Sequence, residues 1–272
     1  MRVPAKAVGG GIVGLILLII TLVLTGGNPG MIFNDNTNVG INTPASYYEG
    51  TTPISQEERE LADFVTIVLA DTEDTWNEIF AAENLDYREP TLVLFSGAVE
   101  SACGFAQSAV GPFYCSVDEK VYIDLSFYRD LRDSFGAGGD FAQAYVIAHE
   151  IGHHVQNQLG IIEEISSAQQ QASIRADANR LSVMLELQAD CMAGVWAYNA
   201  DQARDILEQG DIEEGLNAAS SIGDDRLQMK SQGQVTPDSF THGSSVQRVS
   251  WFERGLEAGD INSCNTFSAM NT

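Results

Sequence analysis

The chain has 272 residues, with 38 acidic side chains against 14 basic ones and a formal net charge of −24 at pH 7. A domain this acidic repels nucleic acid and anionic lipid surfaces, so the composition argues against both as partners of the folded domain. The length suffices for one core of roughly 200–240 residues with appendages.

The amino-terminal segment is apolar. Residues 7–24 carry no charge, consist mainly of Ile, Leu, Val and Gly, and follow Arg2 and Lys6. About 17–20 apolar residues are needed to span a bilayer, and the basic flank favours an amino end in the cytoplasm. A cleaved signal peptide is the alternative, although residues 25–30 match a cleavage site poorly. We therefore expect a single-pass anchor at residues 1–27, with the rest of the chain periplasmic or at the cell surface.

The next segment, residues 28–54, is rich in Asn, Gly, Thr and Pro and has no sustained periodicity, which indicates a flexible linker. A single folded domain is then expected over residues 55–272. Apolar residues at helical spacing predict a long helix over residues 55–84, and Thr91-Leu-Val-Leu-Phe95 predicts a short buried strand.

Four cysteines follow the apolar segment: Cys103, Cys115, Cys191 and Cys264. An even number in an oxidising compartment predicts two disulfides, for which three connectivities are possible. Pairing of Cys103 with Cys115 is favoured because these two close a short loop, which leaves Cys191 with Cys264. No CxxC pair is present, so a zinc site built from cysteines is not expected.

Residues 103–124 predict a β-hairpin. Small residues and Gly111-Pro112 precede Phe113-Tyr114, and a polar turn at residues 118–120 leads into Val121-Tyr-Ile-Asp124. An edge strand at this hairpin could pair with an extended peptide. The domain is thus expected to be α+β, mostly helical, with a small antiparallel sheet or hairpin.

Residues 140–160 predict the helix on which the chemistry depends. Asp140 with Gln143 has the spacing of a capping box, and Gly160 is a plausible stop. His149 and His153 lie four residues apart, so both imidazoles share one face of the helix.

Two histidines on one face can hold one zinc ion, which uses three protein ligands plus a water in hydrolytic sites. Glu150 lies beside the first histidine, where a carboxylate can take the proton of an attacking water. We predict His149 and His153 as metal ligands and Glu150 as the general base. The alternative is a pair of hydrogen-bonded histidines on a core helix, because this short motif also occurs by chance.

Residues 162–198 form a long Ala- and Gln-rich stretch without a helix breaker before Gly194, which predicts a long helix. Glu186 and Asp190 share one face of it, with small residues nearby that would let this helix pack closely against the first. We expect Glu186 to be the third metal ligand and Asp190 to accept the outer ring N–H of a ligand histidine. A solvated acidic pair is the alternative.

Residues 201–232 predict two polar helices without recognisable chemistry, and a last helix passes through Trp251 and Leu256. His242 lies at the start of that last helix. It could donate a hydrogen bond to the oxyanion formed during hydrolysis, or serve only as a capping-region histidine.

Four motifs together resemble the bacterial family of putative neutral zinc metallopeptidases. They are His149-Glu-Ile-Gly-His-His-Val-Gln156, Glu186-Leu-Gln-Ala-Asp-Cys191, Gly111-Pro-Phe-Tyr-Cys115 and Ser239-Phe-Thr-His-Gly-Ser-Ser245. The resemblance covers the amino terminus and most of residues 55–268. It implies a membrane-tethered, zincin-like peptidase of the gluzincin type, which binds Zn²⁺ through His149, His153 and Glu186 and uses Glu150 in catalysis on a peptide or unfolded protein.

Two other functions stay open. One is a non-catalytic zinc-binding or chaperone-like module, which would hold the metal without turnover. The other is a metallohydrolase of a non-peptide amide such as cell-wall material.

Overall fold

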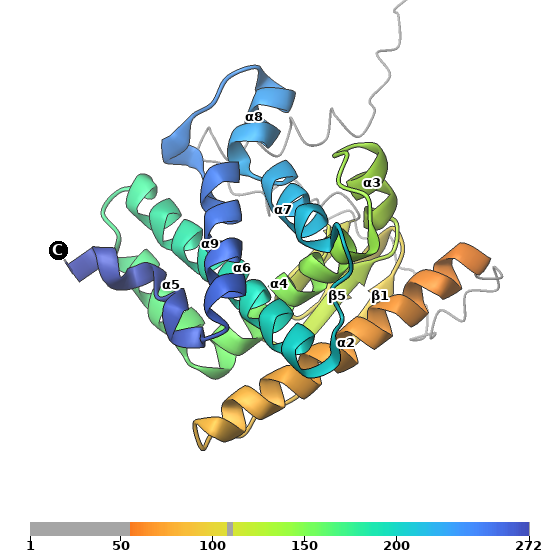
Figure 1. The fold of residues 1–272 in the computed structure, drawn as a ribbon. Coiled ribbons are helices and arrows are strands. Elements are labelled where there is room, and N and C mark those ends of the chain that lie inside the picture. The colour runs from red at the N-terminus through yellow and green to blue at the C-terminus, as the bar shows by residue number, and fades with distance from the viewer. Residues whose placement is uncertain (1–54, 108–110, 272) are drawn as a thin grey trace, which may run out of the picture. The chain divides into compact units, whose positions relative to one another are not determined.

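The computed structural model describes residues 55–107 and 111–271, and all of these from Gln56 onward belong to one compact unit, Gln56–Thr272. This unit is mostly helical with two small sheets, which confirms the α+β class (Figure 1). Its α-helices are α2 (Gln56–Ala82), α3 (Phe127–Asp133), α4 (Asp140–Gln158), α5 (Ile161–Gln171), α6 (Arg175–Arg204), α7 (Asp211–Ser221), α8 (Asp224–Gln232) and α9 (Ser245–Ala258). Short 3-10 helices follow at η3 (Pro237–Ser239), η4 (Ile261–Cys264) and η5 (Thr266–Asn271).

The predicted membrane topology needs correction. Within residues 55–107 and 111–271, every helix is too short or too polar to cross a bilayer. The stretch predicted as an anchor, residues 1–27, and the predicted linker, residues 28–54, lie outside the described residues. The single-pass prediction, the membrane as a partner and the extracytoplasmic placement that rested on them are therefore not supported.

Five short strands form the two sheets: β1 (Thr91–Phe95), β2 (Ala98–Ser101), β3 (Gly104–Gln107), β4 (Phe113–Cys115) and β5 (Lys120–Asp124). The expected hairpin is present as β4 and β5, which pair antiparallel with Tyr114 opposite Val121. The sheet order is β1-β5-β4, and β1 pairs parallel with β5, which was not expected. After β1 the chain forms the separate β2–β3 hairpin and rejoins the first sheet only at β4. It then turns into β5, which can therefore run in the same direction as β1.

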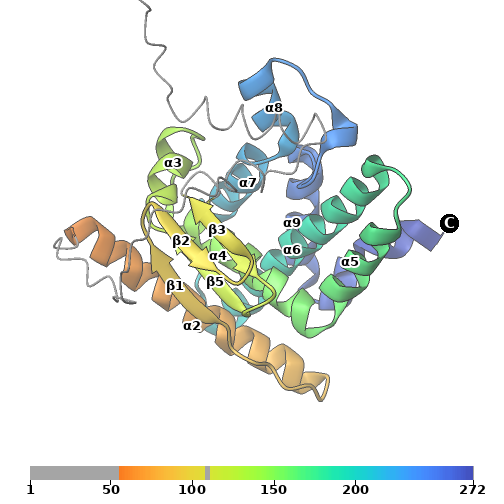
Figure 2. The same cartoon turned by 180° about the vertical axis from the view of Figure 1, so that it is seen from behind.

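Helix α4 lies at the centre of the unit. Fourteen of its 19 residues are buried, so it is covered all round rather than on one face. The three-stranded sheet and α2 lie on one side of α4, and α6, α7 and α9 lie on the other (Figures 1 and 2). Polar side chains on α4 are therefore held inside the molecule, where they need partners.

The start of α4 differs from the predicted capping box. Gly139 is the N-cap residue and provides no side-chain cap, while the Gln143 side chain donates to the Gly139 carbonyl oxygen at 3.2 Å. The Phe141 N–H donates to Asp140 Oδ1 at 2.8 Å and to the carboxylate of Glu214 on α7 at 3.3 Å. Glu214, 73 positions away, thus adds a second acceptor at the helix end.

The long helix expected over residues 162–198 is divided in two. Ile174 is extended, and the chain turns between α5 and α6, which pack against each other. Gln169 on α5 spans the corner and donates to the Ala178 carbonyl at 3.3 Å and the Ser182 hydroxyl at 2.8 Å. Folding α5 back lets Ile165 become buried, which a continuous helix would not provide.

Small residues let α6 approach both of its neighbours closely. A Cβ added to Gly152 of α4 would lie 3.0 Å from the backbone of Ala189. On the opposite face of α6, a Cβ on Gly194 would lie 2.2 Å from the Phe252 carbonyl oxygen of α9. The small residues of α6 therefore serve two different contacts. Ala189 allows the close approach of α4, and Gly194 allows the close approach of α9.

Two disulfides are present, Cys103–Cys115 and Cys191–Cys264, the pairing favoured by the sequence. The first joins the β2–β3 hairpin to β4. The second joins α6 to η4, so it ties the carboxyl-terminal segment to the helix that carries Glu186.

Candidate metal centre

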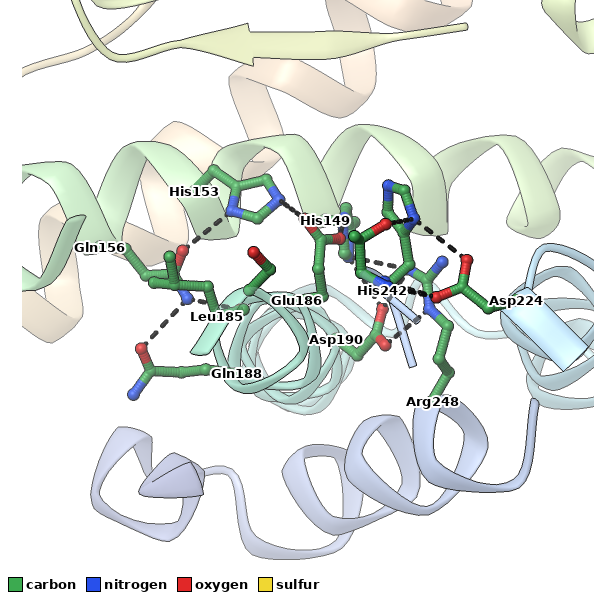
Figure 3. Close-up of polar contacts among 12 residues, drawn as sticks. His149, His153, Gln156, Leu185, Glu186, Gln188, Asp190, Asp224, His242 and Arg248 are labelled. Carbon is green, nitrogen blue, oxygen red and sulfur yellow. Dashed lines mark hydrogen bonds and ion pairs between the residues drawn. The ribbon is translucent and has the colours of Figure 1, made fainter. Parts of the chain in front are cut away.

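His149 and His153 lie one turn apart on α4, and Glu186 of α6 faces both rings (Figure 3). His149 Nε2 lies 3.1 Å from Glu186 Oε2, and His153 Nε2 lies 3.5 Å from Glu186 Oε1. One donor atom from each residue falls within 4.8 Å of the other two. The fold thus brings together the three side chains predicted as metal ligands.

This donor set fits zinc. Two imidazole nitrogens and a carboxylate oxygen at about 2.0–2.2 Å from a tetrahedral metal lie roughly 3.3–3.6 Å from one another, close to the observed separations of 3.1 and 3.5 Å. The side chains of His149, His153 and Glu186 are only 8%, 16% and 19% exposed. The chemistry and the spacing of the residues therefore suit a small divalent cation.

The charges of the site are strongly coupled. Burial opposes a charge on His149, but Asp190 and Glu186 outweigh it and raise the pKa of the imidazole to about 10. Burial likewise opposes a charge on His153, and the Glu186 carboxylate raises its pKa nonetheless. Burial disfavours ionised Glu186, but His153 and His242 hold its pKa well below the usual range. Without a metal, the Glu186 carboxylate thus favours the charged form of both rings.

Asp190 lies one turn beyond Glu186 on α6 and is fully buried. His149 Nδ1 lies 2.8 Å from Asp190 Oδ1, so the ring donates to this carboxylate and turns Nε2 toward Glu186. Burial would raise the pKa of Asp190, but Arg248 and His149 outweigh it and hold the pKa at about 2.

Two partners of Asp190 were missed by the sequence analysis. Arg248 of α9, 2% exposed, donates from Nε to Asp190 Oδ2 at 2.9 Å and from Nη2 to Oδ1 at 2.8 Å. The hydroxyl of buried Tyr145 donates to the same Oδ1. Arg248 itself belongs to no spacing pattern that marks a metal site, and only its place on the buried face of α9, four residues before Phe252, could have suggested a core role.

Glu150 follows His149 on α4 and is 8% exposed. Its carboxylate lies close enough to His153 to favour the charged ring and raise that pKa, and close enough to Tyr128 to disfavour the phenolate. A buried acid is therefore present at the edge of the histidine face, as the sequence predicted.

His242 lies in the loop between α8 and α9, where it is held by Asp224. Asp224 Oδ2 accepts from the backbone N–H groups of Thr241, His242 and Gly243 at 2.7, 2.7 and 3.1 Å, and His242 Nδ1 lies 3.3 Å from Asp224 Oδ1. Figure 3 shows His242 beside His149 and Glu186. Its side chain is 52% exposed; partial desolvation by its neighbours opposes its charge, but Glu186 and Asp224 outweigh this and raise the pKa of His242. The sequence analysis had not identified Asp224.

His154 points away from this cluster. It is 1% exposed, and its ring bonds to the Arg88 carbonyl oxygen at 2.6 Å and to the Tyr114 hydroxyl at 3.0 Å. It joins α4 to the sheet and to the segment before β1, so its position is structural.

Comparison with known proteins agrees with this geometry. Residues 3–267 match the family model described as "Putative neutral zinc metallopeptidase". The chain is 54% identical over 254 residues to "Uncharacterized protein YpfJ" of Escherichia coli K12, with 93% of this chain and 86% of that protein covered. It is 47% identical over 195 residues to "Uncharacterized protein Rv2575" of Mycobacterium tuberculosis, with 68% and 64% covered. No solved structure matches the chain.

The family match spans nearly the whole chain and includes His149, His153 and Glu186, which the fold brings to one point. The chain belongs to the putative neutral zinc metallopeptidase family.

Proposed function

We propose that this protein is a zinc-dependent peptidase in which His149, His153 and Glu186 hold the metal and Glu150 is the general base. The observation that carries the proposal is the convergence of the three donor atoms within 4.8 Å of one another, next to a buried glutamate. Family membership supports the zinc peptidase class. When bound, zinc acts as a Lewis acid that polarises a carbonyl group and lowers the pKa of a water.

The protein side chains supply the proton transfers. Glu150 accepts a proton from the water whose oxygen attacks the carbonyl carbon, and later donates that proton to the departing amine nitrogen as the C–N bond breaks. A buried carboxylate suits both transfers, because few competing waters reach it.

His242 is suited to stabilise the negative charge that develops on the carbonyl oxygen. Its Nδ1 faces Asp224, and Glu186 and Asp224 raise its pKa, so the charged ring, with a hydrogen on each nitrogen, would present Nε2–H as the donor. A donor placed in advance at a developing oxyanion lowers the barrier without reorganisation.

An extended peptide could bind along β4. This strand lies at the end of the β1-β5-β4 order, so only β5 pairs with it among the described strands. Strand addition would supply main-chain hydrogen bonds and leave side chains free for selection.

The test is cleavage of an unfolded protein by the zinc-loaded full chain, measured for the wild type, Glu150→Gln and Glu163→Gln. Glu163 is an exposed acid on α5 and provides the same chemical change away from the site. We expect Glu150→Gln to keep its zinc and to lose about 10³-fold in turnover, and Glu163→Gln to act like the wild type. Stoichiometric zinc without cleavage by the wild type would contradict the peptidase proposal.

A further inference from the structure

We propose that Gln156, supported by Gln188, is a positioning residue that holds His153 in the tautomer with Nδ1 protonated and so presents Nε2 to the metal. This inference rests on the proposed zinc site and adds the element that orients its second histidine. His149 has Asp190 for this purpose, whereas no carboxylate bonds to His153 Nδ1 among the described residues.

Gln156 contacts the His153 ring directly and is itself held by two other residues. Gln156 lies three residues further along α4 and is fully buried, and its Oε1 lies 2.9 Å from His153 Nδ1. Its amide nitrogen donates to the Leu185 carbonyl oxygen at 2.7 Å and to Gln188 Oε1 at 3.1 Å. The Gln188 amide nitrogen donates in turn to the Cys264 carbonyl oxygen at 3.0 Å.

The direction of each of these bonds is determined by chemistry. Backbone carbonyl oxygens can only accept, so the amide group of Gln156 must turn its nitrogen toward Leu185 and its oxygen toward His153. In the same way, the Cys264 carbonyl requires the Gln188 nitrogen, which leaves Gln188 Oε1 to accept from Gln156. A flipped Gln156 would place two oxygens against each other in the core.

The Gln156 amide oxygen determines which nitrogen of the His153 ring carries the hydrogen. An amide oxygen facing Nδ1 accepts a proton from it, so the neutral ring carries its hydrogen on Nδ1 and has its lone pair on Nε2. That nitrogen lies 3.5 Å from Glu186 Oε1, on the side where the metal would sit. The wrong tautomer would leave Gln156 Oε1 facing an unprotonated nitrogen.

The two ligand histidines are thus supported by groups without net charge. Asp190 is balanced by the guanidinium of Arg248, and Gln156 is a neutral amide. Gln156 orients its histidine without adding a further buried charge beside Glu186, which a carboxylate at the same position would do.

The hydrogen bonds that run from Gln156 through Gln188 end at the Cys264 carbonyl, whose position is fixed by other contacts. Cys264 is held to α6 by its disulfide with Cys191, and the Thr266 hydroxyl donates to the Met184 carbonyl oxygen at 2.8 Å. The carboxyl-terminal segment therefore fixes Gln188 on α6, and Gln188 helps to hold Gln156 against His153. Figure 3 shows the contacts of Gln156 with His153, Leu185 and Gln188.

The experiment compares Gln156→Leu, Gln188→Leu and Gln158→Leu with the wild type in the full chain. Gln158 is the control, because it lies on the same helix and loses two hydrogen bonds to the Arg88 backbone and a contact with the His154 ring, which points away from the site. We expect the zinc dissociation constant to rise 10–100-fold in Gln156→Leu, less in Gln188→Leu, where Leu185 still orients Gln156, and not in Gln158→Leu.

A second readout reports the tautomer itself. In ¹⁵N-labelled, zinc-loaded wild type, the His153 Nδ1–H signal should be visible and protected from exchange with water, and it should weaken in Gln156→Leu. Gln156→Glu keeps an acceptor for Nδ1–H, so it should keep the signal, although it loses the donor to Leu185 and Gln188 and should therefore be less stable than the wild type. An unchanged zinc dissociation constant together with an unchanged Nδ1–H signal in Gln156→Leu would overturn the inference.

The results distinguish a failure of the proposed zinc site from a failure of the role proposed for Gln156. A wild-type chain that takes up no zinc would overturn the proposed function and this inference together. A zinc-binding wild type whose Gln156 and Gln188 variants match it in both readouts would overturn the inference alone. Should Gln156→Leu not fold, Gln188→Leu and Gln156→Glu still decide the question.

Discussion

Arg248 on α9 donates two hydrogen bonds, at 2.8 and 2.9 Å, to the Asp190 carboxylate on α6, which is also the partner of His149 Nδ1. Both side chains are almost fully buried, so each charge depends on the other. The pair joins α9 to the helix that carries Glu186, and it keeps Asp190 ionised where His149 needs an acceptor.

Replacing Arg248 by Met should therefore destabilise the protein by about 3–5 kcal/mol, because an unpaired carboxylate remains in the core. Zinc affinity should also fall, since His149 loses a fixed partner. Denaturant unfolding of the metal-free protein and zinc titration measure the two effects. The control is Arg254→Met on the exposed face of α9, where the guanidinium lies over Trp251, and a change of no more than about 1 kcal/mol is expected there. Equal stability of the two variants would contradict the role of the pair.

Glu186→Ala should weaken zinc binding far more than it weakens the fold. The carboxylate bridges His149 and His153 at 3.1 and 3.5 Å, and its removal leaves only two of the three donors. Metal content after dialysis against a weak chelator checks this. Tight, stoichiometric zinc in Glu186→Ala would exclude Glu186 as a ligand.

His242→Phe should lower turnover by about 10²–10³-fold while zinc content stays that of the wild type, because the side chain is proposed to act on the oxyanion and not on the metal. Thr241→Val is the control, since it removes a hydroxyl 3.1 Å from His242 Nδ1 and leaves Asp224 in place. Loss of zinc in His242→Phe, or full turnover in it, would argue against this assignment.

Zinc uptake should be strongly pH-dependent. Without metal, the pKa of His149 is about 10, so this ring is charged at neutral pH, and Glu186 raises the pKa of His153. Zinc must displace the proton that the charged His149 ring carries on Nε2, so its apparent affinity should rise with pH up to about 10, with release of protons on binding. Calorimetry in buffers of different ionisation enthalpy counts the protons. An affinity independent of pH would contradict the observed ion pairs.

The same pKa shift gives a stability prediction for the metal-free protein. A folded-state pKa above the unfolded value of about 6.5 means that the contribution of His149 is fully present below pH 6.5 and is lost as the pH rises toward 10. Unfolding of the metal-free protein should therefore become easier from about pH 7 to pH 10. Zinc-loaded protein, whose rings are already deprotonated, should lack this decline.

The sequence predicted the site residues that lie close together along the chain and missed the partners that lie far apart along it. His149, Glu150 and His153 share a short motif, and Glu186 and Asp190 share a helical spacing, so periodicity alone groups each set. Arg248 lies 58 positions from Asp190, and Asp224 lies 18 positions from His242 across an irregular loop. Such pairs arise from how helices pack, which spacing along the chain does not encode. Gln156 lay within the motif, but its role depends on the Leu185 carbonyl and on Gln188, which the fold brings into contact with it.

The two disulfides should contribute differently. Loop-closure entropy predicts a loss of about 3 kcal/mol on removing Cys103–Cys115 and about 4 kcal/mol on removing Cys191–Cys264, whose sequence separations are 12 and 73 residues. The paired alanine variants, compared by denaturant unfolding, test these values. Only the second disulfide holds the Cys264 carbonyl that accepts from Gln188, so only its removal should also weaken zinc binding under conditions where both variants remain folded. Equal zinc affinity in the two variants would show that the carboxyl-terminal segment stabilises the fold without supporting His153.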